Sequence, residues 1–191
     1  MAHGHGAGHG GDGDSKYIAI FISILALCLA VAETLAKGAQ TNSISYNIEA
    51  SDKWAFFQAK TIRRTTVETA ADQLEIDVKL AKDPTTKAIL EKRVADWRAT
   101  AARYRSEPET QEGSNELMGK AKAAEKKRDL YTEKYHHYEV SSALFQIAIV
   151  LASVYLITHV IYMLWVAGTL AALGFVFGFI GLFFPSAVHL L

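Results

Sequence analysis

Residues 117 to 157 read LMGKAKAAEKKRDLYTEKYHHYEVSSALFQIAIVLASVYLI, and the two ends of this segment differ in polarity. Charged residues crowd its beginning, whereas Val140 to Ile157 contains none. A single stripe with alternating steps of four and three nevertheless runs through the whole segment, a spacing that keeps one helix face toward a partner. The stripe consists of Leu117, Ala121, Ala124, Arg128, Tyr131, Tyr135, Tyr138, Ser142, Phe145, Ile149, Ala152 and Leu156. It predicts one unbroken helix that passes from water into a bilayer.

Two long apolar runs decide the class of protein. Tyr17 to Ala36 has Glu33 as its only charge, and Val140 to Leu191 has no Lys, Arg, Asp or Glu. A bilayer core of ~30 Å needs roughly 20 apolar residues per helix, so the second run is long enough for two spans. We therefore predict an all-α membrane protein with three transmembrane helices and a long helical, coiled-coil-like extramembrane segment between the first and second. The expected parts are a flexible Gly/His tail (1–15), a first span (16–37), a helical stalk (38–138), a second span (139–159), a third span (164–185) and a C-terminal tail (186–191).

The charge pattern and the missing motifs limit the possible functions. Lys plus Arg and Asp plus Glu each number 20, and the interspersed signs indicate a solvated helical surface rather than a nucleic-acid interface. We find no phosphate loop, GxSxG, HExxH, dinucleotide fingerprint or paired cysteines. The single Cys28 lies in the first apolar run and has no partner cysteine within the chain. We expect no enzymatic activity and no cofactor.

The first residues, MAHGHGAGHGGDGD, contain His3, His5 and His9. Glycine at this density indicates a flexible leader, whereas the imidazoles suit Zn, Ni or Cu. A leader without function and a metal site are both open. Ala30-Val31-Ala32 also resembles a signal-peptide cleavage site, but the apolar run continues to Ala36, which favours an uncleaved anchor.

Small residues recur at helical spacing in the first and third spans. Such stripes let helix backbones approach closely in a membrane. The first span carries Ala19, Ser23, Ala26 and Ala30, and the third carries Ala167, Ala171, Gly174, Gly178 and Gly181. The partner of the third-span stripe is either the first span or another subunit.

Local signals divide the stalk into helices. Asp83-Pro84 predicts an N-cap followed by a first helical residue, Pro108 marks a turn, and Ser114 is expected to cap the long helix. We expect three antiparallel helices whose narrow stripes are completed by neighbouring subunits. The residues expected to pack in the stalk are Leu90, Val94, Trp97, Ala101, Tyr104, Leu117, Ala121, Ala124, Tyr131, Tyr135 and Tyr138.

A few polar residues lie at the ends of the spans or within them. Glu33 is close enough to the end of its span to reach water. Gln146 and Ser153 are expected to form hydrogen bonds between helices. His136-His137 with Glu133 and Glu139 forms a compact cluster. Its Glu133 and His137, four residues apart, are a possible metal pair, but interfacial polar residues are the favoured interpretation.

Ala50 to Arg63, ASDKWAFFQAKTIR, resembles the signature of a bacterial membrane family known as domain of unknown function 4337. The motif residues are Trp54, Phe56, Phe57, Gln58 and Lys60. Taken alone, rings beside cations fit a membrane-surface belt or docking patch, or packing within the helical bundle. The resemblance implies a histidine-bearing tail, one span, a charged helical segment and a closing hairpin, with no activity or cofactor attached.

Two signals predict opposite orientations of the chain in the membrane. Members of the resembling family carry a basic loop between the last two spans, which would place the central segment in the periplasm. In this chain that loop has only His159, and the six Lys and Arg between Lys120 and Lys134 favour the cytoplasm. We expect the periplasmic orientation by a narrow margin.

The function that the sequence predicts is structural. We expect a homo-oligomeric scaffold or accessory subunit of the bacterial inner membrane, in contact with lipid and with no nucleic-acid partner. Another membrane complex is a further candidate partner. The alternatives are a channel or transporter component with a pore between subunits, and metal handling through the tail.

Overall fold

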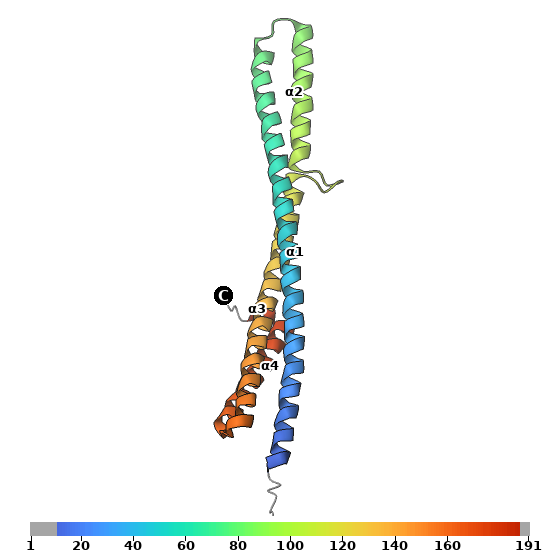
Figure 1. Cartoon of the computed structure of the whole chain (residues 1–191). Coiled ribbons are helices and arrows are strands. Elements are labelled where there is room, and N and C mark those ends of the chain that lie inside the picture. Colours follow the sequence, from blue (N-terminus) through green and yellow to red (C-terminus); the bar gives the residue numbers. More distant parts are fainter. Residues whose placement is uncertain (1–10, 188–191) are drawn as a thin grey trace, which may run out of the picture. The chain divides into compact units, whose positions relative to one another are not determined.

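The computed structural model describes residues 11–187, with side chains from Ser15 onward, and this part of the chain is all-α. Four helices follow one another: α1 (Gly11–Leu80), α2 (Pro84–Arg105), α3 (Ser114–Thr158) and α4 (Ile161–Phe183), with a 3-10 turn at Pro185–Ala187. Figure 1 shows their order. No strand occurs in the described range. The helices α1, α3 and α4 are long and apolar enough to cross a membrane. The all-α prediction with three candidate spans is confirmed.

The contacts divide the chain into two units, which we describe separately. Within the described residues, the apolar unit comprises residues 11–43 and 129–187, and the charged unit comprises Ile44 to Arg128. Helices α1 and α3 each contribute residues to both units.

Helix α1 continues for 70 residues without interruption. The three prolines of the chain, Pro84, Pro108 and Pro185, all lie outside α1, so no proline removes a backbone donor within it. Hydroxyl side chains within α1 donate hydrogen bonds to backbone carbonyls of the preceding turn, as Thr41 Oγ1 does to Lys37 O at 2.9 Å. Such side chains are compatible with a continuous helix. The boundaries expected after residues 15 and 37 are therefore not marked by a break in the helix.

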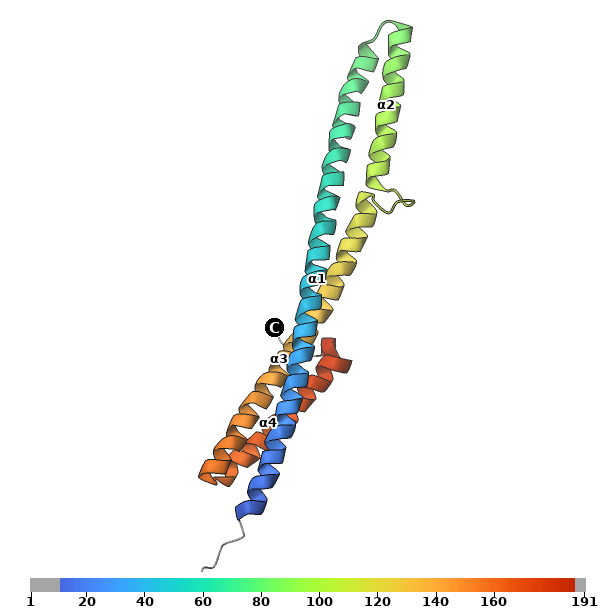
Figure 2. The same ribbon diagram turned by 45° about the vertical axis from the view of Figure 1, so that its right-hand side comes forward.

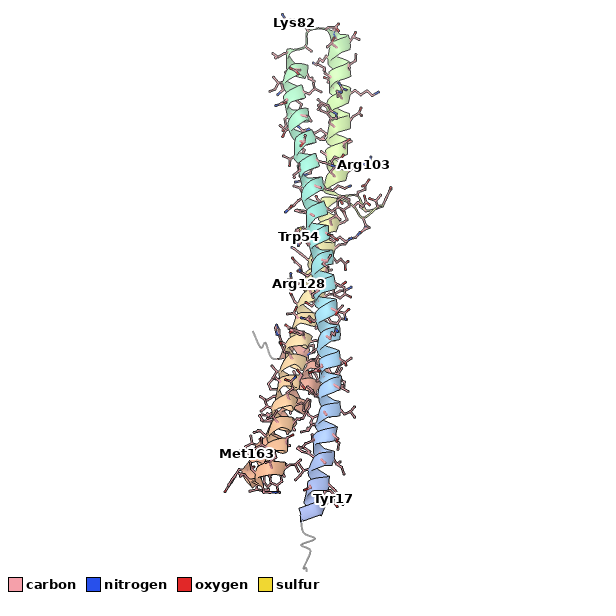
Figure 3. All side chains as sticks on the ribbon, viewed as in Figure 1. Tyr17, Trp54, Lys82, Arg103, Arg128 and Met163 are labelled. Atoms are coloured by element: carbon pink, nitrogen blue, oxygen red, sulfur yellow. The ribbon has the colours of Figure 1, made fainter. Side chains whose placement is uncertain are left out.

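The start of α2 has the predicted cap. Asp83 is extended, and its carboxylate accepts hydrogen bonds from Thr86 N at 2.8 Å and Thr86 Oγ1 at 2.7 Å. Pro84 occupies the first turn, where no backbone donor is needed. Lys82 lies in the turn that joins α1 to α2 (Figure 3).

The start of α3 differs from the prediction that Ser114 is its N-cap. Ser114 is already the first helical residue, and Gly113 O accepts the first helical bond, from Leu117 N at 2.9 Å. The buried Ser114 hydroxyl instead donates to Arg105 O at 3.2 Å, at the end of α2. Gly113 is therefore the cap residue, and glycine suits this position because a Cβ there would lie 2.6 Å from Glu107 N.

The charged unit is two helices thick, which corrects the expectation of three antiparallel helices. Both views show α2 and then the start of α3 following one another along α1 (Figures 1 and 2). Arg98 of α2 pairs with Asp72 and with Glu75 of α1, the latter at 2.9 Å. The start of α3 pairs with an earlier part of α1. Because the 106–113 loop turns the chain only slightly, α2 and α3 share one side of α1.

One stripe on each helix is turned inward in the charged unit. On α2 the predicted residues are the shielded ones: Ala101 is buried, and Leu90, Val94, Trp97 and Tyr104 are partly buried. On α3, Leu117, Ala121 and Ala124 are buried. On α1, the shielded residues include Lys60, Ala71, Leu74 and Val78.

The apolar unit packs α1, α3 and α4 around small side chains. Its core contains Leu25, Ala32, Phe145, Ala148, Ala152, Ala167 and Ala171. A second cluster joins Ala36 and Ala39 of α1 to Tyr138 of α3, with Tyr131 and Tyr135 packed against it. The small-residue stripe predicted on the first span is not part of this core. Its residues Ala19, Ser23, Ala26 and Ala30 are exposed in this chain. Larger residues, Ile18 and Leu25, take the inward face.

The turn between α3 and α4 is shorter than predicted. Helix α3 ends at Thr158, His159 adopts a left-handed backbone (φ 54°), and α4 begins at Ile161 rather than near residue 164. Tyr162 and Trp165 are residue types typical of a membrane–water interface, but neither type prevents a helix from forming, so α4 includes both. Their side chains are exposed in the first turns of α4.

Candidate functional site

The family-like motif lies on α1 in the charged unit, where it contacts α3. Trp54 Nε1 donates to Glu125 Oε1 at 2.8 Å, and the Trp54 ring meets Phe57 edge-on at 5.4 Å (Figure 3 labels Trp54). Both rings are partly buried, whereas Gln58 is exposed. Packing within the unit accounts for the two rings, and this geometry favours the bundle interpretation over a membrane belt.

Lys60 is the buried cation of the motif. Only 8% of the residue is exposed, and its ammonium lies 5.5 Å from the Phe56 ring and 5.6 Å from the Tyr104 ring of α2. Glu112 Oε2 lies 3.8 Å from it. Buried charges are stable only with partners, and two ring faces with one carboxylate supply them. The motif thus holds α1 against the end of α2 and the following loop.

Carboxylates fix the α2–α3 loop. Glu116 Oε1 accepts from Ser106 Oγ at 2.5 Å, and Glu116 Oε2 accepts from Glu107 N at 3.3 Å. The Ser106 hydrogen bond is the main reason that the pKa of Glu116 lies below its ordinary value. Hydrogen bonding from Arg103 likewise lowers the pKa of Glu107. Both groups are ionised near neutral pH and act structurally.

In the apolar unit, α3 holds the segment that follows α4. His137 Nε2 lies 3.0 Å from Pro185 O, and Ser186 Oγ donates to Glu133 Oε2 at 2.7 Å. The His137 ring is 1% exposed and stacks on Phe177 at 6.3 Å. Glu133 and His137, predicted as a possible metal pair, therefore contact successive residues of the 3-10 turn. We call these two interactions the C-terminal clamp.

The glycine-rich stripe of α4 packs on α3. Its partner was expected to be the first span or another subunit. Its glycines instead meet α3, while Ala167 and Ala171 share a core cluster with Leu25 and Ala32 of the first span. Ser141 Oγ donates to Gly174 O at 2.7 Å, and a Cβ added at Gly178 would lie 3.2 Å from the same hydroxyl. A Cβ at Gly181 would lie 2.8 Å from His137 Cβ. Close approach of the backbone is what these positions provide.

Glu33 and Gln146 form a polar pair on the outside of the apolar unit. Gln146 Nε2 donates to Glu33 Oε1 at 3.0 Å, and both side chains are exposed. The predicted interhelical hydrogen bond of Gln146 thus occurs, with Glu33 as its acceptor. Ser153 instead bonds within α3, to Ile149 O at 2.8 Å.

An open apolar groove of about 660 Å³ lies between α1 and α4 in the same unit. Leu27, Val31 and Leu35 line one side, and Phe175 and Phe179 line the other. Its lining is almost wholly hydrocarbon, so it can hold an aliphatic chain. Cys28, Tyr138 and Ser141 also line it.

The metal hypothesis is not addressed by this geometry, because His3, His5 and His9 lie outside the described residues. Within residues 15–187, no three His, Cys, Asp or Glu side chains come close enough together to hold a metal ion. The sequence singled out Lys60 and the Glu133–His137 pair, but it did not indicate their partners, which are Tyr104 and Glu112 for Lys60 and the 3-10 turn for the pair. A histidine 48 residues before Pro185 and a lysine in a charged helix carry no local signal of these contacts.

Comparison with known proteins places this arrangement in a family. Neither the curated proteins nor the solved structures include a match. A family model described as "Domain of unknown function (DUF4337)" matches residues 14–184. This range includes the motif on α1, the α2–α3 loop and both helices of the closing hairpin. The chain therefore belongs to the DUF4337 family.

Proposed function

We propose that this chain is a non-enzymatic, multi-pass protein of the bacterial inner membrane that assembles with copies of itself. Its role is that of a scaffold or accessory subunit. The membrane part of the proposal is supported by α1, α3 and α4, in whose apolar windows at most 22% of the residues are buried. An apolar surface of this extent is unfavourable in water and matches the hydrocarbon core of a bilayer.

One observation carries the self-assembly: in the charged unit, α2 and the start of α3 follow one another along α1 instead of packing side by side. Each helix turns a single narrow stripe inward, and isoleucines remain exposed on the outside, among them Ile44, Ile62 and Ile76. A helix pair of this kind buries little apolar surface, and further helices commonly complete such packing. A coiled-coil-like stalk made by several copies follows from this.

The deciding experiment is native mass spectrometry of the protein extracted with its surrounding lipid. We expect a single closed assembly of identical copies. A monomeric mass in lipid and in mild detergent contradicts self-assembly. A particle of constant composition that contains another membrane protein supports the role of an accessory subunit. The identity of that protein then indicates the cellular process in which the chain takes part.

For the orientation, we propose that residues 38–138 lie in the periplasm, following the family pattern. The basic residues near α3 favour the opposite side, so the test must be direct. A cysteine placed at the exposed Ile89 of α2, with Cys28→Ser, is treated in intact cells with a membrane-impermeant thiol reagent. Labelling supports the periplasmic placement, and labelling only after cell lysis contradicts it.

A pore between subunits is the second candidate, and the Glu33–Gln146 pair is the observation that favours it. A carboxylate exposed on the side of an apolar unit is costly against lipid unless it meets water or a polar partner. Reconstituted vesicles should then pass cations, and Glu33→Gln should reduce the flux. An assembly whose axis is filled with aliphatic side chains excludes this function.

A further inference from the structure

Helix α1 carries a second stripe in the charged unit, turned away from α2 and α3. From Ile44 to Leu80 its residues are uncharged, and the mean step of about 3.6 residues is the period of an α-helix. All of them are exposed. The stripe consists of Ile44, Ile48, Ser51, Ala55, Gln58, Ile62, Thr65, Thr69, Gln73, Ile76 and Leu80. We call it the outer face of α1.

The outer face has the composition of a helix-packing surface. Its five large aliphatic side chains are each more than half exposed, which is uncommon on the water-facing side of a helix. A shallow groove of about 580 Å³ follows the helix past Ile62, Thr65, Thr69 and Gln73. Short side chains between the isoleucines allow a second helix to come close.

The distribution of charge selects the occupant. Copies of one membrane protein share their orientation, so two α1 helices that meet do so in parallel, with each residue beside its own counterpart. A charged face would then place like charges together. Ile48, Ala55, Ile62, Thr69 and Ile76, spaced seven apart, form an uncharged column with β-branched residues at four positions, which suits parallel helix pairs.

The second column of the outer face supports the same arrangement. This column is also uncharged along most of its length, and it consists of Ile44, Ser51, Gln58 and Thr65, again seven residues apart. The next heptad position is Asp72, whose carboxylate is already paired with Arg98 of the same chain. Its charge is therefore offset where two copies approach.

We propose that the outer face of α1 binds the same face of a second copy, in parallel and in register. This inference rests on the self-assembly proposed above and names the surface that mediates it. The contact is formed by residues 44–80, outside the apolar unit. It adds a helix on the side of α1 that α2 and α3 leave open.

The test is disulfide formation in native membranes, in a Cys28→Ser background. Ile48→Cys and Ile76→Cys are introduced singly, because in register each thiol meets only its own counterpart at the Cα separation that a disulfide requires. The matched control is Ile89→Cys on α2, since Ile89 is 64% exposed and Ile76 is 58% exposed. With a mild oxidant we expect dimer yields on the order of tenfold above the control, because an interface raises the effective thiol concentration.

The outcomes separate this inference from self-assembly itself. If native mass spectrometry shows an assembly but neither single variant exceeds the Ile89→Cys control, copies associate through another surface and the inference is wrong. If only the double variant Ile48→Cys/Ile76→Cys is linked between chains, the helices are antiparallel and the inference is also wrong. If the mass is monomeric, both proposals fail.

A second variant tests the energetics. Ile62→Lys places a cation at the centre of the outer face without disturbing the inward stripe, because Ile62 is exposed. We expect the assembly to shift toward smaller species while the helical content stays unchanged. Ile89→Lys is the control and should leave the assembly intact. Equal assembly of the two variants contradicts the proposal.

Discussion

The α3–α4 contact predicts a large difference between two alanine substitutions in the same helix. A Cβ added at Gly181 would lie 2.8 Å from His137 Cβ and 3.0 Å from Tyr138 Cε1. A Cβ added at Gly168 meets nothing within 4 Å. Because His137 Cβ is fixed to the backbone of α3, Gly181→Ala must push the two helices apart.

The magnitude follows from two opposing effects. Overpacking of a close contact costs about 1–3 kcal/mol, whereas replacing glycine with alanine within a helix contributes about 1 kcal/mol of stability. Gly168→Ala has the second effect alone and should be neutral or stabilising. Gly181→Ala should therefore be less stable than Gly168→Ala by about 1–3 kcal/mol, since the helix-propensity gain is common to both.

The assay is reversible unfolding in mixed micelles with increasing SDS, followed by tryptophan fluorescence. Gly178→Ala provides an intermediate point, because its nearest neighbour is Ser141 Oγ at 3.2 Å, and that hydroxyl can rotate away. The expected order of stability is Gly168→Ala, then Gly178→Ala, then Gly181→Ala. Equal unfolding free energies for the first and last variants would refute close packing of α4 on α3.

Three further predictions concern the charged unit. Trp54→Phe removes the hydrogen bond to Glu125 and should destabilise the unit by about 1 kcal/mol, measured by chemical unfolding, with no loss in a Glu125→Gln variant that keeps an acceptor. Gly113→Ala should loosen the α2–α3 loop, seen as faster amide hydrogen exchange there, and unchanged exchange would contradict the close approach of the loop. Because the folded-state pKa of Glu116 is lowered, its contribution should be present above about pH 4 and lost as pH falls through the folded-state value. Carboxyl NMR titration checks this, and Ser106→Ala should return the pKa toward its ordinary value.

The helices and their inward stripes were predictable because each depends on local periodicity. The stripe from Leu90 to Tyr104 and the cap at Asp83 need only the sequence within a few turns of helix. The number of helices side by side was not predictable in this way. It depends on whether the chain reverses at residues 106–113, where Gly113 approaches Ser106 and Glu107 closely, and the spacing of apolar residues carries no signal of that direction.

For the candidate sites too, local spacing predicted the packing face of a helix but not its partner. The stripe on α4 was predicted from its glycines, but its partner α3 was not among the expected partners. Spacing indicates which face of a helix packs and not which helix it meets. The stripe on α1 from Ala19 to Ala30 faces outward in this chain, since small size permits close packing but contributes little buried area compared with Ile18 and Leu25.

The C-terminal clamp has a practical consequence for topology mapping. Pro185 and Ser186 are held against His137 and Glu133 at the start of the apolar part of α3. If α3 and α4 both cross a bilayer, as proposed above, Pro185 and Ser186 lie at the same membrane surface as residues 133–137. A reporter enzyme fused to the C-terminus would then read out the compartment of residues 133–137.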